Sequence, residues 1–441
     1  MLVHSHYKRT KRSLSIKQYI IKTKTMRKFL FLTLLVTLTV TTLTAQQFDL
    51  SAELRPRFEN RHGYKTLMND GVDGANFVSQ RTRLNFNFKQ DKVKLGISLQ
   101  NVRVWGDIST LGANDKSTML HEAWAEALIS DVFSLKLGRQ EIVYDDSRIF
   151  GNVGWAQQAR SHDAMLAKFK FSEKSKLDLG FALNSNGEAL TDVLYAVNQY
   201  KTFQYAWYHT SLSDGLGLSL LALNNGIEYL DGTTQEVDYT QTLGGRLTYG
   251  KGKFGADFSA YLQGGSLKGN DVSANYVGGN LKYKVSPEFN FGGGIEILSG
   301  KDSNDASSDV KSFVPLYGTN HKFNGWMDYF YVGNHGGSVG LVDLSFTLAY
   351  AKDKFSAKVV PHFFSSAADI YDGSTKMENK LGTEIDINLG YKVANNIMFN
   401  VGYSKMFATD SMEILKGGDK DENNSWAWIM FTFKPKLFSS K

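Results

Sequence analysis

Apolar and polar residues alternate one by one along much of the chain. In residues 48–59, FDLSAELRPRFE, apolar side chains take the even positions, and polar or charged side chains take the odd ones. Residues 176–184 and 253–263 repeat this alternation. Strict alternation predicts β-strands with one apolar and one polar face. A soluble sandwich gives the same pattern with shorter strands, whereas a run of about ten residues suits a tilted strand that crosses a membrane.

About 18 such segments lie between residues 48 and 434, and their connections alternate between short and long. The long connections are predicted at 59–77, 105–118, 142–159, 186–199, 225–236, 264–273, 300–340, 366–380 and 407–424. An even-stranded barrel with both ends in the periplasm sorts its connections in this way. The expected fold is therefore all-β: a transmembrane antiparallel β-barrel of about 18 strands, with short periplasmic turns and long extracellular loops.

The front of the chain has the features of a secretory signal. Residues 26–45 place Arg27 and Lys28 before the apolar run FLFLTLLVTLTV, and a small residue, Ala45, ends the segment. This predicts a signal peptide at 26–45, with residues 1–25 as an upstream extension from a misassigned start. Residues 46–441 are expected to form a single transmembrane barrel in the outer membrane of a Gram-negative cell.

The basic net charge of +6 comes from this leader. Nine of the 50 basic residues lie within 1–45, which hold no acidic residue, and the remaining 41 face all 44 acidic residues. No nucleic-acid-binding surface is predicted for such a chain. The chain has no cysteine, which excludes disulfides and thiolate metal sites. No cofactor and no metal are expected.

Arginine is concentrated in the first part of the barrel. Nine of the ten arginines after residue 45 lie between 55 and 160. The alternation places Arg55 and Arg57 on the polar face with Glu53, and Arg81 and Arg83 on the polar face of the next segment. A lipid-facing arginine at mid-depth costs about 2–4 kcal/mol, so these side chains are predicted to face the lumen.

Two further arginines are harder to place from the sequence. The alternation slips near Gln100 and Gly138, close to Arg103 and Arg139, and a β-bulge at either position would explain the slip.

A row of arginines on the lumen wall has two interpretations. Guanidinium groups bind carboxylate, sulfate or phosphate through paired N–H donors, so the row would guide an anionic solute. Glu53, Glu122 and Glu126 on neighbouring strands would position the arginines and keep binding weak enough for release. The alternative is an ion-pair network that only fills the interior.

The segment 138–164, GRQEIVYDDSRIFGNVGWAQQARSHDA, is dense in charge. Its loop 142–159 is expected to fold inward and narrow the pore, with Arg148 among the pore-lining candidates. Ser161, His162 and Asp163 are consecutive, so in a strand they alternate faces and cannot form a catalytic triad. No enzymatic activity is predicted.

A second dense segment, 313–337, lies in the longest connection. His321, His335 and Asp328 match no zinc-binding spacing. Its seven aromatic residues predict a packed cap or a surface on which carbohydrate stacks. The preceding KDSNDASSD is interpreted as a solvated loop rather than a calcium site.

Several sequence segments together resemble the alginate-export family of outer-membrane proteins. They are LRPRFENR, RTRLNF, QNVRVWGD, HEAWAE and the segment 138–164. The resemblance implies a monomeric 18-stranded barrel with an arginine-lined constriction, and it is to a branch of the family with no assigned substrate. It implies that the lumen is lined by Arg55, Arg57, Arg81, Arg83, Arg103, Arg139 and Arg160. It implies that their counter-charges are Glu122, Glu126, Asp145, Asp146 and Asp163.

The function expected from these features is an outer-membrane channel that passes an anionic polysaccharide or a sugar-acid-like solute. An uptake porin for small carbohydrates or general solutes, a sealed structural or adhesive barrel, and an outer-membrane enzyme acting on lipids are the alternatives. The expected partners are the solute, outer-membrane lipid and the barrel-assembly machinery.

Overall fold

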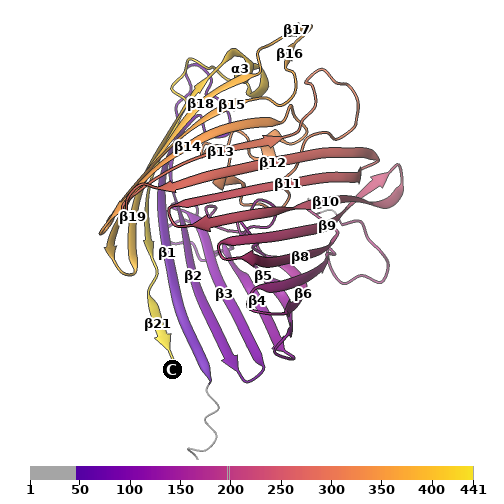
Figure 1. The fold of residues 1–441 in the computed structure, drawn as a ribbon, viewed down its shortest axis with the longest axis vertical. Helices are drawn as coiled ribbons and strands as arrows, with labels where there is room; N and C mark the ends of the chain where they lie inside the picture. The colour runs from indigo at the N-terminus through magenta and orange to yellow at the C-terminus, as the bar shows by residue number, and fades with distance from the viewer. Residues whose placement is uncertain (1–45, 196, 198, 441) are drawn as a thin grey trace, which may run out of the picture.

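A computed structural model describes residues 46–195, 197 and 199–440. The predicted extension and signal peptide, 1–25 and 26–45, lie outside the described residues. The chain forms a closed antiparallel barrel of 18 strands (Figure 1). The barrel strands are β1 (Gln47–His62), β2 (Ala75–Gln90), β3 (Val93–Val104), β4 (Thr118–Leu128), β5 (Phe133–Gln140), β6 (His162–Lys170), β7 (Ser175–Leu183), β8 (Thr202–Ser213), β9 (Leu216–Asp231), β10 (Thr234–Lys251), β11 (Phe254–Leu267), β12 (Asn270–Lys284), β13 (Phe289–Leu298), β14 (Leu341–Lys352), β15 (Phe355–Ser365), β18 (Lys380–Ala394), β19 (Ile397–Ala408) and β20 (Ser425–Phe433).

The barrel closes between its first and last strands. β1 pairs with β20 from Leu54↔Phe433 to His62↔Ser425. After Pro435 the chain continues as β21 (Lys436–Ser439), which pairs with the first residues of β1. The last segment therefore extends the closing strand along β1, and Figure 1 shows β21 and the start of β1 at the same end of the barrel.

The strands carry apolar side chains on the outside of the barrel and polar side chains on the inside, as in a membrane barrel. In β3 the outward-facing Leu95, Ile97 and Leu99 are exposed, whereas the inward-facing Ser98 and Gln100 are only 2% and 1% exposed. An apolar outer face and a polar interior suit lipid on the outside of the barrel. The expected fold class is confirmed.

Two of the predicted long connections are wrong. Residues 225–236 and 264–273 continue as strands, and the turns there contain only residues 232–233 and 268–269. Their alternation is weak because both faces of the strands carry polar residues there. Glu228 of the β9–β10 hairpin, for example, is buried and forms an ion pair with Lys201.

The other elements lie in the loops at the extracellular end. They are η1 (Asn320–Lys322), α2 (Val332–His335), α3 (Asp410–Lys416) and the hairpin of β16 (Tyr371–Asp372) and β17 (Thr375–Lys376). Among the described residues, no helix has both the length and the apolar character to cross a membrane.

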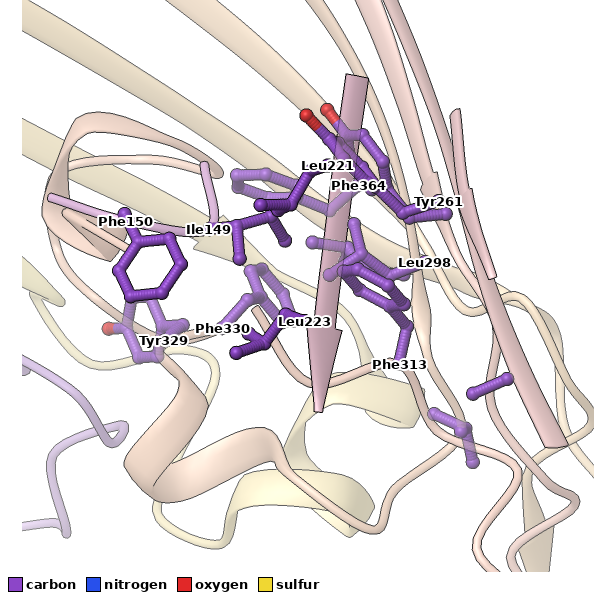
Figure 2. Packing of buried hydrophobic residues seen from close by; sticks show 14 of the residues in the cluster. Ile149, Phe150, Leu221, Leu223, Tyr261, Leu298, Phe313, Tyr329, Phe330 and Phe364 are labelled. Carbon is purple, nitrogen blue, oxygen red and sulfur yellow. The ribbon is translucent and has the colours of Figure 1, made fainter. Parts of the chain in front are cut away.

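Two long loops fill much of the barrel interior, and they are called here the first inner loop (141–161) and the second inner loop (299–340). They meet at a β-bridge between Phe150 and Tyr317. Figure 2 shows buried side chains of both inner loops, among them Phe150 and Phe330, together with side chains of the barrel wall; Phe150 packs against Phe203 and Tyr205, and Phe330 packs against Phe364. The apolar core of this protein thus lies inside the barrel, between loops and wall.

Candidate functional site

The first inner loop crosses the lumen from β5 to the opposite wall and then reaches β1. Near its start, Asp145 accepts hydrogen bonds from Trp207 Nε1 of β8 at 2.9 Å and from Ser219 of β9 at 2.5 Å. Asp146 forms an ion pair with Arg246 of β10. Farther along, Gln157 Nε2 donates to Ser79 of β2 at 3.0 Å. The predicted inward fold of 142–159 is therefore present.

Arg55 binds this loop through neutral groups alone. Its Nη1 donates to the Gly154 carbonyl at 2.8 Å, and its Nη2 donates to the Trp155 carbonyl at 3.0 Å. Its Nε donates to Gln157 Oε1 at 3.1 Å. A buried guanidinium needs acceptors for its five N–H donors, and the loop backbone supplies them. In this conformation, Arg55 anchors the loop.

Arg57 and Arg81 use the same stretch of backbone. Arg57 Nη1 donates to the Trp155 carbonyl at 2.8 Å, and Arg81 Nη1 donates to the Gln157 carbonyl at 3.3 Å. Arg81 also forms an ion pair with Glu53 at 2.7 Å. Arg55, Arg57 and Arg81 of β1 and β2 thus point toward the first inner loop and together hold residues 154–157.

Arg57 takes part in a stack of rings as well. Its guanidinium carbon lies 3.9 Å from the centre of the Trp155 ring. His321 of the second inner loop is nearly parallel to Trp155, with centroids 4.7 Å apart. Glu59, which is fully buried, accepts from both Arg57 and Arg61 at 2.8 Å. The stack therefore joins β1 to both inner loops.

Arg83 lies deeper along the same wall. It donates to Gln100 Oε1 at 2.7 Å, and its Nη1 lies 3.8 Å from Glu141 of the first inner loop. Glu141 also contacts two consecutive residues of β4. The Glu141 carboxylate lies 2.7 Å from His121 Nε2, and the backbone N–H of Glu141 donates to Glu122 at 3.1 Å.

A β-bulge explains why neighbouring residues of β4 both turn inward. The register between β3 and β4 shifts at Ser98 and Leu99, opposite the pair His121 and Glu122. A bulge of this kind inserts one extra residue and redirects a side chain. The register shift lies close to Gln100, but its extra residue is His121 of β4, and the register of β3 against β2 is continuous, as is the register across Gly138. Glu126, farther down β4, accepts from Lys94 at 3.1 Å.

Two predicted pore-lining residues face away from the lumen. Arg139 continues the outward parity of Leu137, because no bulge intervenes, and it pairs with Asp163 at 2.8 Å on the outer surface. The lumen-lining prediction is wrong for Arg139 and Asp163. Arg103 has the opposite parity to the inward-facing Gln100, but it lies at the rim, where it pairs with Asp115 and lines the cavity at the mouth of the barrel.

The remaining arginines of the segment 138–164 belong to the packed interior. Arg148 is 1% exposed and lies 3.2 Å from Glu296 of β13. Arg160 donates to the Gly318 carbonyl at 3.1 Å, and burial lowers its pKa. Arg148 thus joins the first inner loop to the barrel wall, and Arg160 joins it to the second inner loop.

The second inner loop is held by carboxylates of β13 and β18. The N–H of Trp326 donates to Asp386 at 3.1 Å, and the N–H of Met327 donates to Glu384 at 2.8 Å. Asn324 donates to Glu296 at 2.7 Å. Carboxylates of β18 therefore hold backbone N–H groups of the second inner loop, and arginines of β1 and β2 hold backbone carbonyls of the first.

The histidines of the segment 313–337 have structural partners. His321 Nδ1 lies 2.8 Å from Asp328, and His335 Nε2 donates to the Gly340 carbonyl at 3.0 Å. Burial lowers the pKa of His335 to about 3, so this ring is neutral. No group of three or more potential ligands with metal-binding geometry occurs in the described part of the chain. The expected packed cap is the arrangement observed.

A cavity of about 660 Å³ opens above this assembly, and it is called here the vestibule. Its walls carry the cations Arg57, Arg61 and Lys65 and the rings of Tyr64 and Tyr331. Its volume lies within the range of sites that bind small molecules. The nearby Asp328 accepts a hydrogen bond from Tyr64, and this contact and burial raise the tyrosine pKa.

A family model described as alginate export matches residues 46–427. The chain belongs to the alginate export family. The resemblance of the sequence segments is thereby confirmed, and the protein is an outer-membrane barrel of the porin type in a Gram-negative cell.

Solved structures of outer-membrane channels share the fold. Acinetobacter baumannii OccAB1 matches with a TM-score of 0.60 and 12% identity, over 89% of this chain and 97% of that one. Pseudomonas aeruginosa OccK3 (OpdO) matches with a TM-score of 0.59 and 14% identity, over 89% and 96%. A comparison with curated proteins found no match. At these identities, the similarity shows the fold alone.

The site of this alginate export family member includes residues that sequence analysis missed. Arg246 lies outside the cluster of arginines between 55 and 160, and it shares the inward parity of Thr242 and Thr248. Glu296 and Asp386 each lie between apolar residues of their strands, and Glu384 has the same parity as Asp386. Alternation therefore identifies all of them as inward-facing, but their loop partners have no such pattern.

The consecutive residues Ser161, His162 and Asp163 do not converge. His162 points inward, where its Nδ1 lies 2.9 Å from the Tyr200 hydroxyl, and Asp163 is on the outer surface with Arg139. Family and fold are those of channels.

Proposed function

We propose that this alginate export family channel passes an anionic carbohydrate, a sugar acid or a short anionic saccharide, which binds first in the vestibule. The observation that supports this most is the combination of Arg61 and Lys65 with Tyr64 and Tyr331 around one cavity. Guanidinium and ammonium groups attract a carboxylate. Aromatic faces pack against the apolar C–H faces of a sugar ring.

The charge balance of the vestibule favours an anion. Glu59 is buried beneath Arg57 and Arg61, which both donate to it. Asp328 lies at 6% exposure and is engaged by Tyr64 and His321. These two acids are therefore covered, whereas the side chain of Arg61 is 33% exposed. Asp107, the third acid of the lining, is exposed, but the four lining cations, Arg57, Arg61, Lys65 and Arg103, outnumber the three carboxylates.

The inner loops limit the size of the solute. They join both walls through the contacts of residues 154–157 and 324–327. A sugar acid fits the vestibule in this conformation. A polysaccharide requires displacement of the inner loops, so polymer and small solute differ in whether these loops must move.

Single-channel conductance of the refolded barrel in a planar bilayer tests the proposal. We expect anion-selective current in a salt gradient, with transient block by galacturonate and weaker block by neutral galactose. Arg61→Gln/Lys65→Gln should weaken the block by galacturonate at least about tenfold, since each charged contact contributes about 1.5–3 kcal/mol.

Arg139→Gln is the matched control, because Arg139 lies on the outer surface and pairs with Asp163. It should leave the block unchanged. Equal block by galactose and galacturonate would contradict the anionic class. A barrel without current would indicate a sealed structural barrel, and block by polyuronate alone would favour the polymer.

A further inference from the structure

Two further hollows lie on the other side of the inner loops from the vestibule, near the short turns. One hollow has a volume of about 530 Å³ and the other about 410 Å³. Both are lined by Lys168, Lys176, Asp178 and His209 of β6, β7 and β8. The larger hollow includes the turns 129–132 and 171–174, so it faces the periplasmic end of the barrel.

The lysines of these hollows are not neutralised. Within the described residues, neither Lys168 nor Lys176 has a carboxylate oxygen within 4.0 Å of its ammonium group. The neighbouring acids have other partners: Glu126 binds Lys94 at 3.1 Å, and Asp178 accepts from the Tyr144 hydroxyl at 2.8 Å. Two ammonium groups on the lumen wall thus offer donors to an anion.

Rings and hydrogen-bonding groups complete the lining. Trp207 and His209 are nearly parallel, with centroids 5.8 Å apart and an interplanar angle of 13°. Tyr144 stacks on Trp207 at 4.3 Å, and Lys176 lies 4.8 Å from the same ring. Asp145 and Asp178 carry acceptor oxygens at the edge. The ammonium groups and the acceptor oxygens in one hollow match the carboxylate and hydroxyls of a sugar acid, and Trp207, only 4% exposed, packs behind them.

We infer that these residues form a second binding site for a sugar acid, on the periplasmic side of the inner loops, in which Lys168 and Lys176 bind the carboxylate. This inference rests on the proposed function. The vestibule and this periplasmic site then lie at opposite ends of the constriction. A solute is bound on each side of the inner loops, and weak binding at two sites permits passage.

Addition of galacturonate separately to each side of an oriented bilayer tests the inference. Lys168→Gln/Lys176→Gln should weaken block from the periplasmic side at least about tenfold, because two charge-assisted contacts are lost. Block from the extracellular side should not change. The reverse pattern is expected for Arg61→Gln/Lys65→Gln.

Lys251→Gln/Lys253→Gln is the matched control. It removes the same charge at another periplasmic turn, outside both hollows. Heat-modifiable electrophoretic migration confirms that each variant is folded. An undiminished periplasmic block in the Lys168/Lys176 variant would overturn the inference alone, provided that extracellular block persists.

Absence of block from both sides in the unmodified channel would instead overturn the proposed function, and the inference with it. Equal periplasmic block by inorganic phosphate and galacturonate would overturn the assignment to a sugar acid. An equal effect in the Lys251/Lys253 control would show that only the net charge of the periplasmic opening matters, which also overturns a specific site.

Discussion

The guanidinium carbon of Arg57 lies 3.9 Å from the centre of the Trp155 ring, and His321 of the second inner loop is nearly parallel to the same ring. A single indole thus connects β1 to both inner loops. Trp155→Ala should loosen residues 154–157, since a cation–π contact contributes about 0.5–2 kcal/mol. We expect larger and noisier single-channel currents. Trp105→Ala, at an exposed loop position, is the control, and identical traces for both variants would contradict a role for the stack.

Arg55 should be needed for its geometry rather than its charge. An ammonium group cannot reach the carbonyls of Gly154 and Trp155 and the side chain of Gln157 together. Arg55→Lys should therefore destabilise the first inner loop by about 1–3 kcal/mol. Limited proteolysis of 141–161 measures this effect. Arg61→Lys, in the open vestibule, keeps its charge and should leave the proteolysis of 141–161 nearly unchanged. Equal proteolysis of the two variants would contradict an anchoring role.

Gly325 fits closely against the carboxylate wall. Its φ is +83°, and a Cβ there would lie 2.7 Å from Glu384 Oε2. Gly325→Ala should displace residues 324–327 and increase hydrogen exchange at the N–H groups of Trp326 and Met327. Gly337→Ala is the matched control, because its φ is +71° with no atom within 4 Å of a Cβ. It carries only the backbone strain of about 1–2 kcal/mol.

His335 should make the second inner loop sensitive to acid. Burial lowers its pKa to about 3, with Lys416 as the nearby cation. An exposed histidine has a pKa near 6.5, so the opened loop takes up a proton first as pH falls. The stabilisation is complete above about pH 6.5 and is lost progressively toward pH 3, at about 1.4 kcal/mol per pH unit.

Hydrogen exchange of 313–337 between pH 7 and pH 4.5 measures this loss. His335→Gln keeps a donor for the Gly340 carbonyl and removes the titration. Its exchange, corrected for intrinsic rates, should depend less on pH. An unchanged slope would assign the acid sensitivity to another group.

Prediction from the sequence is most accurate where one face of a strand touches lipid. Leu95, Ile97 and Leu99 alternate with Ser98 and Gln100 because hydrocarbon lies on one side and the lumen on the other. The same rule places Arg55, Arg57, Arg81 and Arg83 inward. For Arg103 and Arg139 the alternation is ambiguous, and the lumen position that the family resemblance implies is wrong for Arg139. The alternation also ends too early in the β9–β10 and β11–β12 hairpins, where the strands extend beyond the lipid.

The sequence by itself determined the barrel, its number of strands, the family and the inward face of each regular strand, because a two-residue period follows from the local geometry of a strand beside lipid. Only the tertiary structure decided what the arginines bind. Gln157 meets Arg55, and Asp146 meets Arg246, across about a hundred residues of chain. Such pairs arise when irregular loops fold into a closed lumen, and no local pattern in the sequence records which wall a loop reaches.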